Sequence, residues 1–247
     1  MIDRRAFALG LAATAASCAR GPNLDRLTLG EQGRAVGVRS GEVLNLDSGL
    51  EVRLAGIEAP NGSEPLANEA RALLSAAVLG KPVTLLYGGL KRDRYERALA
   101  HVRLEAGRRW MQGEVLAAGL ARVRTYPDNR ALAAEMLQAE ARARRAKKGL
   151  WAIDAYRVLL PYECPGKSGF QIVEGKVRQV AVTSGSVLLD FQGGGARAEV
   201  PRFVSADFAA AGHAPEGLKD RLIRVRGNLR DGVIRLNHPE TLEMLRN

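Results

Sequence analysis

The chain has 247 residues, 46% of them hydrophobic, and its Lys and Arg residues outnumber Asp and Glu by ten. This length and apolar content suffice for packed cores in one large or two small domains. No segment of the mature chain is long and apolar enough to span a bilayer. The positive excess is typical of a non-specific basic surface or of a protein with a polyanionic partner, and we favour the partner.

The first 18 residues have the layout of an export signal. The pair Arg4-Arg5 precedes a mildly apolar run rich in Ala and Gly, as in a twin-arginine signal peptide. The four residues that end at Cys18, Ala-Ala-Ser-Cys, resemble a lipoprotein cleavage box with Cys18 as the acylated residue; ordinary cleavage near Ala15 or Ala19 is the alternative. We therefore expect a periplasmic or cell-envelope protein that touches the membrane only through an N-terminal lipid anchor.

The two cysteines of the chain are Cys18 and Cys164. An acylated Cys18 leaves Cys164 without a partner, so we expect neither a disulfide framework nor a disulfide-linked partner. Cys164 is expected to be a buried or linker thiol. The three histidines are scattered along the chain and form no Cys/His cluster for zinc.

After a polar, unpatterned tether over residues 19–32, the chain becomes rich in predicted strands. The apolar residues alternate between turns that contain glycine, and the Ala- and Leu-rich segment 64–79, followed by Gly80, predicts a helix. The predicted strands are 35–39, 43–46, 50–57, 82–87 and 98–104, and the later helices are 111–120 and 129–148. Three strands, a helix and two strands predict a five-stranded OB-type barrel with packed helices over residues 33–152.

Residues 153–168 contain two prolines and a glycine near Cys164 and are predicted to be a linker. The segment 169–247 repeats the order of three strands, a helix and two strands, which favours a second, smaller OB-like barrel. The predicted strands are 171–183, 186–191, 197–203, 222–227 and 232–236, and the helix is 205–211. The fold class is thus mainly β with α (α+β). Few aromatic residues of this part are spaced for base stacking, which weakens a prediction of single-strand binding there.

Two stretches carry candidate site residues. Arg53 lies on a predicted strand that delivers Glu58 to its end. Arg97 follows Tyr95 at the start of another predicted strand. Two arginines and a carboxylate suit a phosphate group beside a hard cation, because guanidinium pairs with phosphate oxygens and carboxylate oxygens bind cations such as calcium.

At these residues the chain resembles the staphylococcal nuclease (thermonuclease) family, over roughly residues 33–151. The resemblance implies an OB-fold nuclease that hydrolyses DNA or RNA with the help of a calcium ion. It implies that Arg53 and Arg97 clamp the phosphate, with Tyr95 beside them. It also implies that Glu42 and Glu58 are the metal ligands.

Several positions depart from the family pattern. The first acidic motif, usually Asp-Gly-Asp-Thr, is Ser-Gly-Glu-Val over residues 40–43, and the second, usually Asp-Thr-Pro-Glu, is Glu-Ala-Pro-Asn over 58–61. Both metal positions keep a carboxylate, each longer by one methylene. Asn61 stands in the place of the catalytic base, and an amide cannot take a proton from water at neutral pH. Glu64 could substitute as the base, although an early acidic residue of a helix is the simpler interpretation.

Three functions stay open on the sequence alone. The first is an exported, calcium-dependent nuclease with weakened activity. The second is a catalytically silent, nucleic-acid- or anion-binding envelope lipoprotein that keeps the arginine clamp. The third is an envelope scaffold that uses both barrels for protein contacts, and the strongly positive charge of the chain argues against it.

Overall fold

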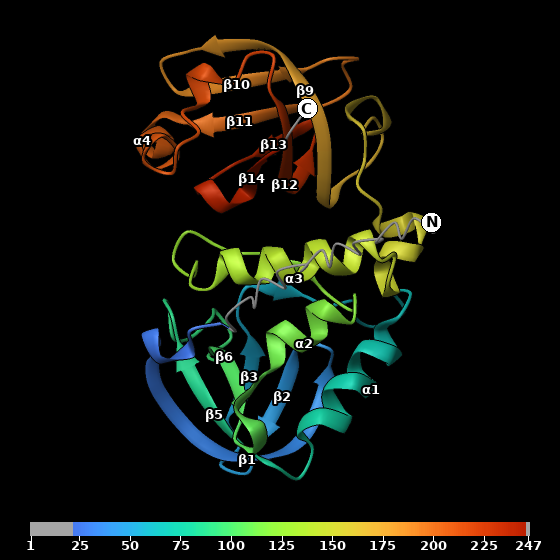
Figure 1. Ribbon diagram of the computed structural model, residues 1–247, viewed down its shortest axis with the longest axis vertical. Coiled ribbons are helices and arrows are strands. Elements are labelled where there is room, and N and C mark those ends of the chain that lie inside the picture. Colours follow the sequence, from blue (N-terminus) through green and yellow to red (C-terminus); the bar gives the residue numbers. More distant parts are fainter. Residues whose placement is uncertain (1–21, 246–247) are drawn as a thin grey trace, which may run out of the picture.

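The computed structural model describes residues 22–245 and contains two closed β-barrels of five strands each, with four α-helices (Figure 1). The barrels follow one another along the chain, and the long helix α3 (Ala133–Arg145) lies between them in Figure 1. The predicted fold class, mainly β with α and built on OB-type barrels, is confirmed. Within residues 22–245, no helix is long and apolar enough to cross a membrane. The predicted signal peptide and Cys18 lie outside the described residues.

The first barrel is closed by one parallel strand pair. Its neighbouring strands are antiparallel except β3 and β6, which run parallel and join the two ends of the sheet. The elements are β1 (Thr28–Ser40), β2 (Val43–Leu46), β3 (Glu51–Leu54), α1 (Ala67–Val78), β5 (Pro82–Tyr87), β6 (Ala98–Leu104), β7 (Arg109–Trp110) and α2 (Met111–Ala117). Their leucine, valine and alanine side chains form one continuous core.

The second barrel repeats this topology with a core of its own. A parallel pairing of β11 with β13 closes it, in the position that the β3–β6 pairing takes in the first barrel. The short strand β14 extends the sheet beside β12. The elements are β9 (Gly169–Val182), β10 (Ser186–Phe191), β11 (Arg197–Pro201), α4 (Arg202–Ala210), β12 (Leu222–Arg230), β13 (Val233–Arg235) and β14 (Leu242–Met244).

The first strand is longer than predicted, because β1 begins at Thr28 instead of Ala35. Its first half pairs with β5, with Thr28 opposite Tyr87, and its second half pairs with β2. Most side chains of the first half are exposed or half-buried, so they lack the apolar–polar alternation that marks a half-buried strand. The predicted tether over residues 19–32 is therefore too long by residues 28–32.

The third predicted strand is split at Gly56. This residue has a φ of 77°, and a Cβ there would lie 2.4 Å from a methionine side chain of α3, so glycine is required. The chain changes direction at this point. The short strand β4 (Ile57–Glu58) then pairs with β8 (Arg122–Val123) and sets Glu58 opposite Arg122. The break at Gly56 therefore decides the surroundings of Glu58.

The predicted linker over residues 153–168 packs against the second barrel instead of spanning open solvent. Leu159 and Cys164 are only 4% and 1% exposed and belong to the second core. The Leu159 N–H donates a hydrogen bond to the Ile172 carbonyl at 2.9 Å. Pro161 opens a short 3-10 helix rather than a flexible joint. The burial of the Cys164 thiol agrees with the prediction for it.

A buried ion pair joins the two barrels. Glu140 of α3 is fully buried, and Arg226 of β12 is 1% exposed. The two Nη groups of Arg226 donate to the two carboxylate oxygens of Glu140, each at 3.0 Å, and Nη2 also reaches Glu243 at 2.5 Å. Burial by itself raises the pKa of Glu140, but the Arg226 charge and hydrogen bonds bring that pKa below its ordinary value. The pair is therefore held in its charged form.

Further polar contacts cross the interface between the barrels, among them those of Arg130 and Thr125. Arg130 donates to both carboxylate oxygens of Glu240, at 2.7 and 2.9 Å. The Thr125 hydroxyl and His238 Nε2 lie 2.8 Å apart in a hydrogen bond. Together with the buried ion pair, these contacts lead us to expect that the two barrels move as one unit.

Acidification is expected to destabilise the protein between pH 6.5 and about 4. Burial lowers the pKa of both His101 and His238 from 6.5 to about 4. The unfolded chain binds protons in this range that the native state excludes, so the free energy of unfolding falls as the pH falls, by up to about 3 kcal/mol per histidine. Urea unfolding at neutral pH and near pH 4.5 measures the loss. His238→Gln should lose less stability than the wild type over this pH range, and equal losses in both proteins would contradict a depressed pKa of His238.

Candidate functional site

Glu42 lies in the tight turn between β1 and β2 and points into the protein. The preceding Gly41 lets this turn approach α1, because a Cβ at Gly41 would lie 2.5 Å from the Ala70 Cβ. Glu42 Oε1 accepts a hydrogen bond from Arg53 Nε at 3.2 Å, and Oε2 accepts one from the Ala59 N–H at 2.9 Å. Both oxygens of this buried carboxylate are thus engaged by the protein itself.

The partners of Glu42 offset only part of the cost of burying its charge. Glu42 is 8% exposed. Burial raises the pKa of the Glu42 carboxyl above its ordinary value, although the Arg53 charge and the Ala59 N–H both favour the ionised form. The ion pair with Arg53 thus lowers the cost of a carboxylate at this depth.

Glu58, at the end of β4, is enclosed by two arginines. Its Oε2 accepts a hydrogen bond from Arg122 Nη2 at 3.1 Å, and its Oε1 accepts one from Arg124 Nη1. Arg122 and Arg124 are only 11% and 22% exposed in their side chains, so solvent screens these pairs weakly. The second candidate metal ligand is thus neutralised on both oxygens.

Arg53 and Arg97 lie on one side of the barrel. Arg53 and Glu51 are two positions apart on β3, so their side chains lie on the same face of the strand. Arg97 Nη1 lies 3.7 Å from Glu51 Oε1. Arg97 is oriented by Asp93, whose Oδ2 accepts from Nε at 2.8 Å and pairs with Nη2 at 2.7 Å. Arg53 uses only its Nε for Glu42, and its two Nη groups have no hydrogen-bond partner within residues 22–245. The structure therefore brings the predicted arginine pair together, with donors available to an anion.

Tyr95 stands beside this pair on an exposed loop. The residue is 62% exposed, and its ring lies under two guanidinium groups, 4.8 Å from Arg94 and 5.2 Å from Arg97. Glu96 has a φ of 62°, in the left-handed region that favours glycine. Its side chain is exposed. Tyr95 and Arg97 thus form an open cation–π surface next to the site.

Asn61, the residue at the base position, is exposed on the loop before α1. Its backbone N–H donates to Glu64 Oε2 at 2.8 Å, and the Glu64 N–H donates to the Asn61 carbonyl at 3.1 Å. This reciprocal pair closes a turn. Glu64 is therefore occupied as a turn residue, and the structure gives no support to its role as a substitute base.

Three site residues were not predicted from the sequence. Arg122, Arg124 and Tyr126 alternate along and after β8, so the period-two pattern Arg-Val-Arg-Thr-Tyr over residues 122–126 was an available signal. Their partners, however, come from distant segments. The guanidinium of Arg122 lies 4.9 Å from the Phe170 ring and that of Arg124 lies 5.1 Å from it, and Phe170 belongs to the second barrel.

Comparison with known families identifies part of the chain. Residues 51–153 match the family model described as staphylococcal nuclease homologue. This segment is a staphylococcal nuclease homologue (SNase) domain. The match contains Arg53, Glu58, Asn61 and Arg97, whereas Glu42 and the second barrel lie outside it. Comparison with curated proteins gave no match.

The first barrel, which contains the SNase domain, does not fit a calcium ion at Glu42 and Glu58, the position that the family resemblance implies. The family is generally calcium-dependent, and calcium takes about six to eight oxygen ligands. Here the four carboxylate oxygens of Glu42 and Glu58 already accept hydrogen bonds from arginines or from the Ala59 N–H. Within residues 22–245, no three His, Cys, Asp or Glu side chains gather in a way that could hold a metal. The longer glutamates reach cationic partners instead.

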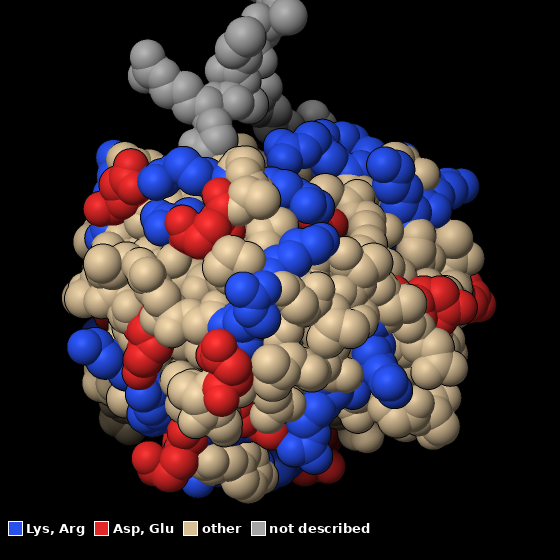
Figure 2. Space-filling model, turned by 90° about the horizontal axis from the view of Figure 1, so that it is seen from below, with Lys and Arg blue, Asp and Glu red and all other residues tan. Residues whose placement is uncertain are grey.

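The face of the SNase domain that points away from the second barrel is not uniformly basic. Figure 2 views the molecule from this side and shows Lys and Arg side chains interspersed with Asp and Glu, with a basic group along one edge. A mixed surface of this kind gives weak non-specific attraction to polyanions. Any specific anion site is therefore expected where arginines keep donors available, as at Arg53.

Proposed function

We propose that the protein binds nucleic acid through the arginines of its SNase domain, without calcium and with little or no hydrolysis. One observation carries this proposal: each carboxylate oxygen of Glu42 and Glu58 accepts a hydrogen bond from the protein itself. A cation would have to displace two arginines from Glu58 and one from Glu42. The arginines that a phosphate would contact, in contrast, lie together and keep donors available.

Binding without hydrolysis follows from the chemistry of the site. Phosphodiester hydrolysis needs a base for the attacking water and a cation for the developing charge. Asn61 provides no base, and the two glutamates hold arginines in the place of a metal. Arg53 and Arg97 can still neutralise and orient a phosphate through their forked donors. The arrangement favours the silent, nucleic-acid-binding alternative over the weakened nuclease.

Digestion of single- and double-stranded DNA and RNA by the mature protein tests the catalytic part of this proposal. We expect cleavage to be slow and equal in calcium and in chelator. Asn61→Glu alone is expected not to create calcium-dependent cleavage. A general base raises the rate by roughly 10²–10⁴-fold, but only where a cation is also bound beside the phosphate. Asn68→Glu, an exposed substitution on α1, is the matched control. Brisk calcium-dependent cleavage by the wild type refutes a silent site.

We also propose export and lipid anchoring at Cys18. The paired Arg4-Arg5 and the box that ends at Cys18 support this proposal. We expect that the mature chain begins at Cys18, carries acyl groups and incorporates labelled palmitate. Mass analysis of the mature N-terminus provides the measurement, and an unacylated chain that begins at another residue rules out the anchor.

A further inference from the structure

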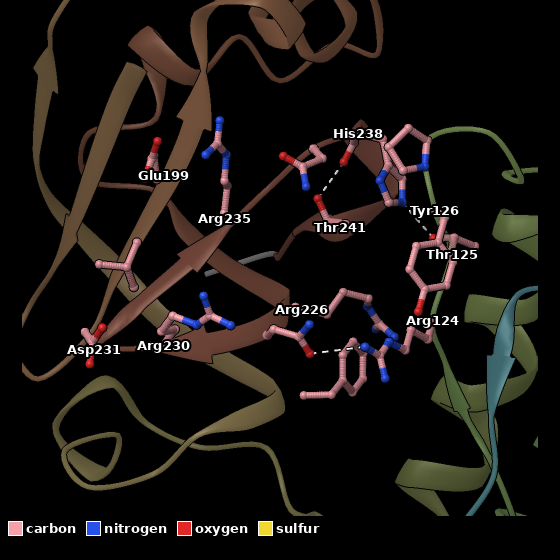
Figure 3. A pocket seen from close by; sticks show the side chains of 16 residues that line it. Arg124, Thr125, Tyr126, Glu199, Arg226, Arg230, Asp231, Arg235, His238 and Thr241 are labelled. Carbon is pink, nitrogen blue, oxygen red and sulfur yellow. Dashed lines mark hydrogen bonds between the residues drawn. The ribbon is translucent and has the colours of Figure 1, made fainter. Parts of the chain in front are cut away.

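A cavity of about 520 Å³ lies between the two barrels (Figure 3). In Figure 3, Arg230 and Arg235 of the second barrel lie on one side of it, and Arg124 and Tyr126 of the SNase domain lie on the opposite side. Phe170, at the start of β9, also lines it. The cavity thus combines arginines with two aromatic rings drawn from both domains.

The second barrel presents an outward, basic strand face to this cavity. Alternate residues of β12 and β13 point to opposite faces: Leu229 and Ile234 are buried in the core, whereas Arg230 and Arg235 are exposed. Neither arginine has an ion-pair partner in the part of the chain that the structure describes. Two carboxylates, Glu199 and Asp231, also line the cavity. Arg230 and Arg235 balance their charge, because the other two lining arginines, Arg124 and Arg226, are already paired with Glu58 and Glu140.

Arg124 links the wall of the cavity to Glu58 of the SNase domain. Arg124 uses one Nη group for Glu58 and donates the other to the Asn228 side-chain oxygen of β12 at 3.2 Å. Tyr126 follows two residues later and is 39% exposed. A chain-like ligand that leaves the SNase site in this direction therefore meets Tyr126 first and the arginines of the second barrel next.

One buried polar atom in the cavity wall lacks a partner. His238 lines the cavity and is 3% exposed. Its Nε2 is hydrogen-bonded with Thr125, but its Nδ1 has no hydrogen-bond partner within residues 22–245. Buried polar atoms are normally satisfied, so this wall is suited to a polar ligand or to ordered water.

We propose that the cavity is the second half of one continuous nucleic-acid site, which accepts a single strand. This inference rests on the proposed function and adds its substrate class. Phosphates would contact Arg230 and Arg235, and a base would stack on Tyr126 or Phe170. Aromatic stacking beside a basic groove favours a single strand, because the bases of a duplex are stacked on each other and shielded from side chains.

Oligonucleotide length separates the two halves of the site. We compare a dinucleotide with a single strand of about 12 nucleotides, a length that spans one or two OB folds, in the wild type and in Arg230→Ala/Arg235→Ala. The double variant is expected to bind the longer strand roughly tenfold or more weakly, because two phosphate contacts are lost. Its dinucleotide affinity should be unchanged. The slope of log affinity against log salt should also fall in magnitude by about 1.4, because each phosphate contact on a single strand contributes about 0.7 and two contacts are lost.

Lys219→Ala/Arg221→Ala is the matched control, because it removes the same charge from exposed positions just before β12 begins. Tyr126→Leu supports the stacking role if it weakens binding of the longer strand on the order of tenfold. Equal effects of the two double variants overturn the proposed cavity site, as does tighter binding of a duplex than of a single strand. If the wild type binds no nucleic acid at all, the proposed function itself is refuted. This outcome differs from failure of the cavity site, in which the wild type still binds.

Discussion

Replacement of Arg226 by Met is expected to lower the free energy of unfolding by about 3–5 kcal/mol, because it leaves a buried carboxylate without its main partner. Glu140 is fully buried, and Arg226 donates to both of its oxygens at 3.0 Å. The Val123 N–H and Arg144 remain near Glu140 after the change, but they cannot replace a bidentate guanidinium. The loss should also uncouple the barrels, since the pair crosses their interface.

Urea unfolding followed by two optical probes tests this prediction. Trp110 belongs to the core of the first barrel, whereas Trp151 packs against Ile172 of β9. In a Trp151→Phe background the fluorescence of Trp110 therefore reports the SNase part, whereas far-UV circular dichroism reports the whole chain. The wild type should give one shared transition, and Arg226→Met should give separate ones. Arg221→Met, at an exposed position, should change stability by no more than about 0.5 kcal/mol. A fully stable, cooperative Arg226→Met variant contradicts the buried interface.

The pair Glu140→Gln/Arg226→Met provides an internal check. Glutamine keeps an acceptor for the Val123 N–H and removes the buried charge of Glu140, while Glu243 keeps Arg224 as its partner. Replacement of a whole buried ion pair is often close to neutral, so this double variant should recover most of the stability that Arg226→Met loses. If the double variant is as unstable as Arg226→Met, the lost free energy of unfolding comes from packing rather than from the unpaired charge.

The double variant Arg53→Ala/Arg97→Ala is expected to bind oligonucleotides roughly a hundredfold or more weakly. Each arginine offers a charge-assisted contact worth about 1.5–3 kcal/mol, and a factor of ten corresponds to about 1.4 kcal/mol. Arg53 keeps two Nη groups available, and Asp93 orients Arg97. Fluorescence anisotropy with a labelled strand measures the affinity.

Arg53→Lys keeps this prediction testable if the alanine variant unfolds. Removal of Arg53 also removes the partner of buried Glu42, and lysine preserves the charge while it loses the fork. Its affinity should fall between those of the wild type and Arg53→Ala. Arg39→Ala, on a side chain 69% exposed, is the control on the same barrel. Unchanged binding in the folded Arg53 and Arg97 variants places the site elsewhere.

The fold was predictable from local patterns, and its irregular parts were not. Alternating apolar residues and the glycine turns located all five strands of each barrel, because these signals arise within a few residues. The start of β1 at Thr28 and the packed segment 153–168 depend on contacts with remote strands. The break at Gly56 was hidden within an apolar run, because only its φ and the nearby α3 reveal it.

The candidate site was predictable in its arginines but not in the state of its carboxylates. Arg53 and Arg97 stood out because both belong to a recognisable motif. Glu42 and Glu58 looked like metal ligands, since sequence alone cannot show that Arg122 and Arg124 fold onto Glu58 across the β4–β8 pairing. The role of Arg226 depends on Glu140, 86 residues away, so no local signal could have indicated it.

The affinity of the wild type for a labelled single strand, measured in calcium and in chelator at equal ionic strength, tests the central claim most directly. Arginine contacts need no metal, so the two dissociation constants should agree, and the affinity should fall steeply as salt is raised. Equal ionic strength matters because divalent ions also screen phosphate. A strand that binds only when calcium is present would show that the cation displaces the arginines from Glu42 and Glu58, which contradicts an arginine-held, calcium-independent site.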